Sequence, residues 1–182
     1  MTLKIVKIGN PILRRKARPV PAHLFRTPSL RRFVRNMVST MRRAQGVGLA
    51  ANQVAQGRRV MVMECRGNRR YPKAASFPLQ AYLNIRIIHR SKRKVKGWEG
   101  CLSIPGFRGL VPRSQRVTFR AVTPDGSKVE KTVSGFEARV IQHEVDHLNG
   151  LFYLDRMDGF KSWTHLEEFN RRLRFKIRDR RS

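Results

Sequence analysis

The chain of 182 residues contains little cysteine and no long apolar run. Its two cysteines, Cys65 and Cys101, lie far apart in the sequence, which is typical of a reduced compartment and argues against a disulfide scaffold. No segment approaches the roughly 18 apolar residues that a membrane-spanning helix needs. Residues 1–15 contain no apolar block of the kind found in signal peptides. We therefore expect a soluble protein of the cytoplasm, or the mature form of an organelle protein, with no membrane partner.

Acidic residues are also scarce, because 12 Asp and Glu stand against 40 Lys and Arg and leave a net charge of +28. The basic residues are spread along the whole chain. Such a surface attracts polyanions, above all RNA, through phosphate contacts that do not depend on sequence. The alternative is a charged surface that serves solubility alone. No RNA-reading motif is present, so the charge indicates where the protein works rather than its chemistry.

Apolar residues make up 40% of the chain, which is enough for a core without disulfides. Its length and the absence of internal repeats favour a single domain spanning residues 1–182. Residues 29–43 carry apolar side chains at steps of three and four, which predicts an amphipathic helix. A last helix is expected from residue 162 to about 177, within a basic C-terminal helix or tail covering about residues 160–182.

Strands are predicted where apolar and β-branched residues lie between turn signals, at residues 58–65, 81–90, 93–98, 116–123 and 128–134. The last two flank the sequence PDGS, whose Asp-Gly pair predicts a hairpin turn. Residues 46–54 are small and expected to be flexible, and residues 66–80 are expected to form a loop. Most strands precede the histidine-bearing helix without βαβ alternation. The predicted class is therefore α+β, with antiparallel or mixed sheets around the central histidine-bearing helix and a helix near each terminus.

The segment IQHEVDHLNG places two histidines four residues apart, with a glutamate directly after the first. Positions i and i+4 of a helix lie on the same face, so His143 and His147 can bind one ion. Glu144 lies about 100° around the helix axis from His143 and can reach a water molecule on that ion. Metal binding lowers the pKa of such a water, and a carboxylate can then accept its proton. This is why His-Glu-x-x-His recurs in metal hydrolases.

The helix that carries this motif has predicted boundaries. Ser134 with Glu137 three residues later predicts a capping box at its start, and Gly150 is a suitable end. Apolar neighbours such as Val140 and Val145 indicate that the helix is buried. Two ordinary surface histidines are the alternative, and this burial argues against it.

A catalytic metal site needs a third protein ligand and an open position for water. Tyr153 stands where the longer zinc-protease pattern has its third histidine, and a phenol is a poor substitute. Glu167 and Glu168 have the spacing of a glutamate ligand in another protease group, but on a basic helix a solvated carboxylate is the more common role. Cys101, in EGCLSIPG, is the third candidate, although a lone cysteine beside glycine is more often a packing residue.

Three segments occur in the order GVGLAANQ (46–53), EGCLS (99–103) and QHEVDH (142–147). Together they resemble the three signature segments of peptide deformylases, enzymes that remove the formyl group from the initiator methionine of nascent polypeptides. Any one segment could occur by chance, whereas all three in this order are specific. The resemblance extends over about residues 3–158 and includes NPILRRKA near the N-terminus.

This resemblance implies a set of catalytic residues. It places three metal ligands on Cys101, His143 and His147. It implies that a metal-bound water attacks the formyl carbon, that Glu144 acts as general base and then general acid, and that formate is released. Negative charge on the formyl oxygen would be stabilised by the side-chain amide of Gln53 and the backbone N–H of Leu102.

The resemblance also implies substrate contacts, which fall on Gly46, Val47, Gly48 and Gly100. Arg108 is a further candidate for reaching the substrate backbone. Glu99 is implied to be structural, and Arg113 is either its partner or a surface charge. Arg139 stands one turn before the first histidine, where family members usually have an apolar wall for the methionine side chain. The resemblance therefore does not determine the shape of the methionine pocket.

The implied native metal is Fe²⁺, while Zn²⁺, Ni²⁺ or Co²⁺ could also occupy a site of one thiolate and two imidazoles. The implied partners are N-formylmethionyl nascent peptides. The basic surface and the C-terminal helix favour proximity to the ribosome and its rRNA.

Two other functions stay open. A metalloprotease with Glu167 or Glu168 as third ligand would keep its endopeptidase activity in a Cys101→Ser variant. An RNA-binding protein with an inactive deformylase-like fold would bind RNA with steep salt dependence and would not hydrolyse peptides, although the intact ligands and Glu144 argue against it. We interpret the remaining cysteine, Cys65, as a core residue. The remaining histidines are interpreted as surface residues, namely His23, His89 and His165.

Overall fold

The computed structural model describes residues 1–66 and 75–178, with side chains as far as residue 172. The helices are α1 (Pro28–Arg43), α2 (Gly135–Leu148) and α3 (Leu166–Arg178). The strands are β1 (Gly48–Ala50), β2 (Val60–Cys65), β3 (Phe77–Arg90), β4 (Lys94–Cys101), β5 (Ile104–Ser114), β6 (Arg116–Val122), β7 (Lys128–Ser134) and β8 (Thr164–His165). Short 3-10 helices include η3 (Ala51–Val54) and η4 (Tyr153–Arg156).

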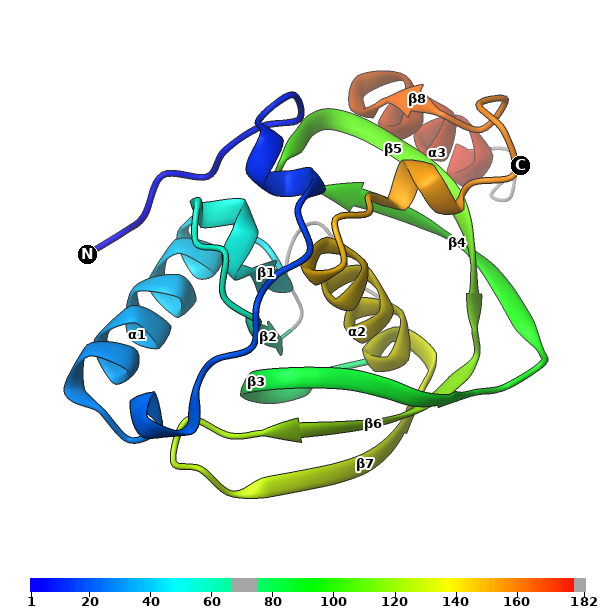
Figure 1. Ribbon diagram of the computed structural model, residues 1–182. Coiled ribbons are helices and arrows are strands. Elements are labelled where there is room, and N and C mark those ends of the chain that lie inside the picture. The colour runs from blue at the N-terminus through cyan, green and yellow to red at the C-terminus, as the bar shows by residue number, and fades with distance from the viewer. Residues whose placement is uncertain (67–74, 179–182) are drawn as a thin grey trace.

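The strands form two antiparallel sheets with α2 between them (Figure 1). One sheet has five strands in the order β1-β2-β3-β6-β7, and the other has three in the order β4-β5-β8. All neighbouring strands in both sheets run antiparallel. The predicted α+β class, with sheets packed around a central helix, is confirmed.

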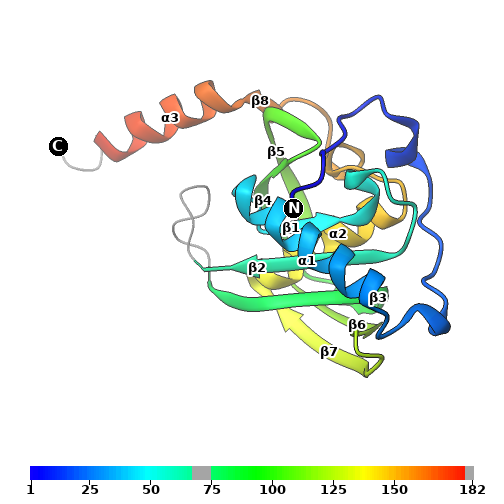
Figure 2. The same ribbon diagram turned by 90° about the vertical axis from the view of Figure 1, so that its left-hand side faces the viewer.

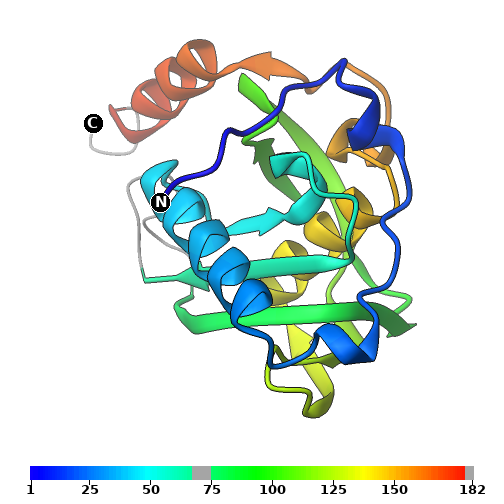
Figure 3. The ribbon, with the colours of Figure 1, turned by 60° about the vertical axis from the view of Figure 1, so that its left-hand side comes forward.

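The strand β2 shows how the layers are held together. All of its side chains are buried, and successive side chains of a strand point to opposite faces. Val60 and Val62 belong to the core shared with α1, whereas Met61 and Met63 belong to the core shared with α2. Figure 3 shows α1 and α2 on opposite sides of this sheet. The unbroken apolar sequence of β2 is what a strand covered on both faces requires.

Two predicted elements are found within one or two residues of their predicted bounds. Helix α1 begins at Pro28, and the hydroxyl of Thr27 caps it by accepting the Leu30 N–H at 3.3 Å. The predicted hairpin is formed by β6 and β7. In its turn, the Asp125 carboxylate accepts the Ser127 N–H at 3.0 Å.

Strand β5 was not predicted, because two prolines and two glycines interrupt its apolar pattern. Strand β4 lies along one edge of β5, while β8 pairs only with Phe107 and Arg108 on the other. Most of that second edge therefore has no strand neighbour among the described residues, and proline is tolerated on such an edge.

Two predictions of irregular structure were wrong. Residues 46–54 are not a flexible segment, because they contain β1 and η3, and residues 48–54 are all buried. Their small side chains permit close packing between α1, α2 and the sheet. Residues 77–80 of the predicted loop belong to β3, and residues 67–74 of that loop lie outside the described residues.

The ends of α2 and α3 also differ in part from prediction. The Ser134 side chain does not cap α2, and the Glu137 carboxylate instead accepts hydrogen bonds from Gln80 and Lys131, both at 3.0 Å. Gly150 follows α2 with φ +78°, as an end signal should. Helix α3 starts at Leu166 rather than residue 162, because the two residues before it pair with β5. Within the described part of the chain, no helix is both long and apolar enough to cross a membrane.

Candidate metal centre and active site

The three predicted metal ligands meet in the interior, where the end of β4 lies against α2. The ligand atoms of Cys101, His143 and His147 all lie within 4.8 Å of one another. The Cys101 Sγ is 3.1 Å from the Nε2 of His147. The two histidines are one helical turn apart, with ring centroids separated by 4.9 Å. One thiolate and two imidazoles at these distances form a donor set that fits a divalent transition-metal ion.

The electrostatics of the cluster also suit a metal. Burial disfavours a thiolate, but His147 and His143 outweigh it and hold the pKa of the Cys101 thiol well below its usual range. Burial likewise opposes a charged imidazole, yet hydrogen bonds to Cys101 and Glu99 raise the pKa of His143. A sulfur that is ionised at neutral pH is what metal binding requires.

The other candidates for the third ligand lie elsewhere. The Tyr153 hydroxyl accepts a hydrogen bond from Trp163 at 3.2 Å, and its ring stacks beside His143. Glu168 is paired with Arg171 on α3, and the Glu167 side chain is 87% exposed. Within the described residues, the only cluster suited to a metal contains Cys101. The geometry therefore disfavours the metalloprotease interpretation.

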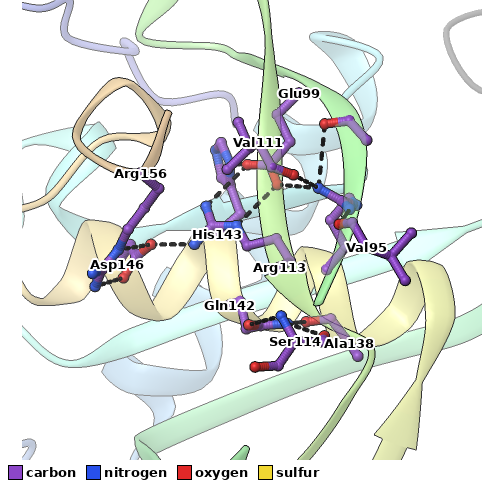
Figure 4. Close-up of polar contacts among 12 residues, drawn as sticks. Val95, Glu99, Val111, Arg113, Ser114, Ala138, Gln142, His143, Asp146 and Arg156 are labelled. Atoms are coloured by element: carbon purple, nitrogen blue, oxygen red, sulfur yellow. Dashed lines mark hydrogen bonds and ion pairs between the residues drawn. The ribbon is translucent and has the colours of Figure 1, made fainter. Parts of the chain in front are cut away.

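Glu99 orients the first histidine ligand (Figure 4). Its carboxylate lies 2.9 Å from the Nδ1 of His143 and receives a bidentate pair from Arg113 at 2.9 and 3.0 Å. Burial opposes ionisation, but Arg113 and the hydrogen bond from His143 lower the pKa of the Glu99 carboxyl. An ionised Glu99 assigns the Nδ1 proton to its own hydrogen bond and leaves Nε2 free to bind a metal. Arg113 is thus the partner of Glu99, and the surface alternative was wrong.

A second ion pair fixes α2 to β5. Arg113 also contacts the buried carboxylate of Asp146, whose other oxygen is 2.8 Å from Arg156. The Gln142 amide forms two hydrogen bonds with the backbone of Ser114, at 3.1 and 2.9 Å (Figure 4). These contacts set the rotation of the helix, and therefore the direction of both imidazoles. None was predicted beyond the Glu99–Arg113 pair.

Glu144 lies beside the ligands, with 4% of its surface exposed. Burial raises the pKa of its carboxyl. One carboxyl oxygen, Oε2, has no hydrogen-bond partner among the described residues. A Cβ atom added at Gly48 would overlap this carboxyl, so a larger residue there would displace Glu144 from its present position. A buried carboxyl with an unused oxygen is suited to proton transfer with a bound molecule.

Gln53 approaches the same point from η3. Its Oε1 accepts the Ala50 N–H at 2.9 Å, which orients the amide. Its Nε2 then donates toward Ser103 Oγ at 3.2 Å and Cys101 Sγ at 3.5 Å. The donor is thus held beside the metal cluster. Leu102, which follows the cysteine, lines the same cavity.

A cavity opens onto these groups from between β1, β4 and α2. The predicted catalytic and substrate-contact residues that line it are Gly46, Val47, Gly48, Gln53, Gly100, Cys101, Leu102, His143 and Glu144. Trp98, Phe136 and Val140 add apolar surface that was not predicted. The spacing of Phe136, Val140 and His143 on one helix was a signal that could have found two of them.

Two predicted site residues do not line this cavity, namely His147, which is fully buried, and Arg108. Arg108 lies on β5 opposite Thr164, and its guanidinium is 5.1 Å from the ring centroid of Phe169. Arg139 does line the cavity, and its guanidinium is held by the carbonyl oxygens of Val95 at 2.6 Å and Val111 at 2.9 Å. Its charged end is therefore fixed against β4 and β5.

Comparison with known proteins gives a consistent result. Residues 2–163 match the family model described as polypeptide deformylase. The chain is 40% identical over 167 residues to peptide deformylase 2 of Pseudomonas putida, covering 92% of this chain and 94% of that protein. It is 41% identical over 163 residues to peptide deformylase 1 of Bordetella pertussis, covering 90% and 92%.

Two solved structures are also similar. One is the Met-Ala-Ser-bound class I type b peptide deformylase of Acinetobacter baumannii, with 39% identity and a TM-score of 0.85 over 86% of this chain and 99% of that chain. The other is the peptide deformylase of Thermotoga maritima, with 33% identity and a TM-score of 0.77 over 87% and 99%.

Proposed function

We propose that the cluster of Cys101, His143 and His147 removes the N-formyl group from nascent peptides, because the chain belongs to the polypeptide deformylase family. The members of this family are metal-dependent hydrolases that catalyse this reaction. The metal ligands in this proposal are Cys101, His143 and His147. The observation that carries it is the convergence of a sulfur and two imidazoles within 4.8 Å. We propose Fe²⁺ as the native ion, with Zn²⁺, Ni²⁺ or Co²⁺ able to replace it. When bound, such an ion lowers the pKa of a water ligand and polarises a carbonyl group.

Glu144 moves the proton. Its buried carboxyl has a raised pKa and an oxygen without a partner, and a cation held by its neighbours would favour the carboxylate form. The carboxylate accepts a proton from the attacking water and returns it to the amide nitrogen as the C–N bond breaks. Formate and a free N-terminus are the products.

Gln53 and the backbone N–H of Leu102 stabilise the negative charge that develops on the formyl oxygen. The Gln53 amide is neutral at every pH and is oriented before substrate arrives by its bond from Ala50. Loss of one such donor typically lowers the rate about 10²–10³-fold.

The peptide binds beside β1, with Gly46, Val47, Gly48 and Gly100 as its contacts. Strand β1 is an edge strand of the five-stranded sheet, so its free edge can pair with an extended peptide. The related Acinetobacter baumannii structure contains the peptide Met-Ala-Ser. In this chain, Phe136, Val140 and Trp98 supply apolar surface for a methionine side chain.

The decisive test is formate release from a formyl-methionyl peptide by protein purified without oxygen. The Glu144→Ala variant should keep its metal and lose at least about 10²-fold in kcat, because Glu144 has the one unpartnered carboxyl oxygen found in this cavity among the described residues. Glu137→Ala is the matched control, since Glu137 is a carboxylate on the same helix that bonds to Gln80 and Lys131. A Glu144→Ala variant with the parent's turnover would refute the assignment, as would activity in a Cys101→Ser variant that has lost its metal.

We also propose that α3 and the basic surface bring the enzyme close to ribosomal RNA. Figure 2 shows α3 extending away from the rest of the molecule. Truncation after residue 160 should weaken ribosome association and leave hydrolysis of a small peptide intact. Because Trp163 stacks on Phe107 at 4.3 Å, a milder variant, Arg171→Gln with Arg172→Gln, separates charge from packing. Unchanged ribosome binding in both variants would exclude this role for the helix.

A further inference from the structure

A second cavity lies on the face of α2 opposite the metal ligands. Val145 and Asn149 line it, and at about 100° per residue Val145 points roughly 200° away from His143. Its volume is about 490 Å³. The charged residues that line it are all basic, namely Lys16, Arg59, Arg86 and Arg90. The chain therefore gathers four cations around one hollow, from the N-terminal segment, the start of β2 and the end of β3.

Arg59 is a buried cation with only neutral partners. It is 6% exposed. Its guanidinium donates to the carbonyl oxygens of Ile85 at 2.8 Å and Leu148 at 3.2 Å, and to Asn149 Oδ1 at 2.9 Å. No carboxylate of the described residues forms an ion pair with it. Burial and the charge of Arg86 lower the pKa of Arg59, which is the sign of a positive charge that lacks a counterion.

The surroundings do not neutralise this charge. The C-terminal end of a helix carries about half a negative charge, and Arg59 already donates to that end of α2 through Leu148. Asp146 raises the pKa of Arg90, but its two oxygens are bonded to other arginines. The partial charge at the end of α2 and the carboxylate of Asp146, which other arginines share, are too little negative charge to balance the four cations that line the cavity.

We propose that this cavity binds a phosphate group, either a phosphodiester of RNA or the phosphate of a small molecule. Guanidinium groups match the geometry of phosphate oxygens and bind them through paired, charge-assisted hydrogen bonds. A bound phosphate would supply a direct ion pair, which none of Arg59, Arg86 and Arg90 forms with a carboxylate of the described residues. The site is independent of the hydrolytic reaction, because its residues and those of the metal centre lie on opposite faces of α2.

The test is a titration of the metal-loaded full-length protein with inorganic phosphate, followed by the NMR signals of the Arg59 side chain. The parent should show a saturable shift. In Arg86→Gln/Arg90→Gln, loss of charge-assisted bonds should raise the dissociation constant about tenfold or more. The matched control is Arg31→Gln/Arg35→Gln, which removes the same charge at the same spacing from exposed positions on α1.

The outcomes separate a built site from general attraction. No saturable shift at Arg59, or equal weakening in both double variants, would overturn the proposal. If Arg86→Gln/Arg90→Gln fails to fold, as judged by circular dichroism, Lys16→Gln/Arg90→Gln gives the same test.

Competition then identifies the source of the phosphate. Displacement by a short RNA without a terminal phosphate points to a phosphodiester, and displacement only by a nucleoside monophosphate points to a small molecule. Displacement by neither would mean an adventitious ion only, and the proposal would be wrong.

Discussion

Two buried arginines lie near opposite faces of α2, and they are paired in opposite ways. Arg113, on the side of the metal centre, is 5% exposed and contacts the carboxylates of Glu99 and Asp146. Arg59, on the other side, is 6% exposed and contacts only carbonyl and amide oxygens. A neutralised network holds a ligand such as His143 in one orientation. A cation without a counterion is instead suited to receive one from outside.

The largest expected effect comes from removing each arginine. Arg113→Met leaves two buried carboxylates without their partner and should lower the free energy of unfolding by about 3–5 kcal/mol. Arg59→Met leaves only neutral acceptors unpaired and removes a buried charge, so the loss should be smaller, about 1–3 kcal/mol. Urea unfolding of the metal-free proteins measures both. Equal losses would mean that the two arginines are held in the same way.

The next effect concerns the metal. Glu99→Gln weakens the hydrogen bond that orients His143 and should reduce metal affinity about 10–100-fold, measured by competition with a chromophoric chelator. The control is Glu137→Gln on the same helix, which should keep the parent's affinity. If the metal affinity of Glu99→Gln equals that of the parent, the network of Glu99, Arg113 and Asp146 has only a structural role.

The smallest expected effect is a pH dependence of the free energy of unfolding, which arises from Asp146, the carboxylate that contacts Arg113. Although burial opposes it, Arg156 and Arg113 lower the pKa of the Asp146 carboxyl below its unfolded value of about 4. Asp146 therefore contributes stability that is complete above about pH 4 and is lost as the pH falls through the folded pKa, worth about 1.4 kcal/mol per unit of lowering.

Urea unfolding of the metal-free protein at pH 6 and at about pH 3 gives this slope. Asp146→Asn should reduce this slope and leave the part with the same sign that Glu99 contributes through its own lowered pKa. Arg86→Gln should leave the slope unchanged, because arginine stays charged throughout this range. If the stability of Asp146→Asn falls with pH as steeply as that of the parent, the acid sensitivity arises from other groups.

Much of the candidate site followed from local patterns. The spacing of His143 and His147, with Glu144 between them, is a property of one helix and can be read from the sequence. Cys101 could be identified only through its resemblance to a family motif, because 42 positions separate it from the nearer histidine and no local rule spans that distance. Arg108 was a candidate for a substrate contact, and in the structure its guanidinium lies 5.1 Å from the ring centroid of Phe169 and does not line the cavity.

What the sequence determined by itself was periodic or adjacent: the amphipathic α1, the β6–β7 hairpin with its Asp-Gly turn, and the histidine pair on α2. These depend on interactions within a few residues of the chain. Only the tertiary structure decided that Glu99, Arg113 and Asp146 form one network, that β5 is a strand despite its prolines, and that Lys16, Arg59 and Arg90 surround one cavity. Such contacts join residues far apart in sequence, and their free energy depends on burial and neighbouring charge, which exist only once the sheets have closed around α2.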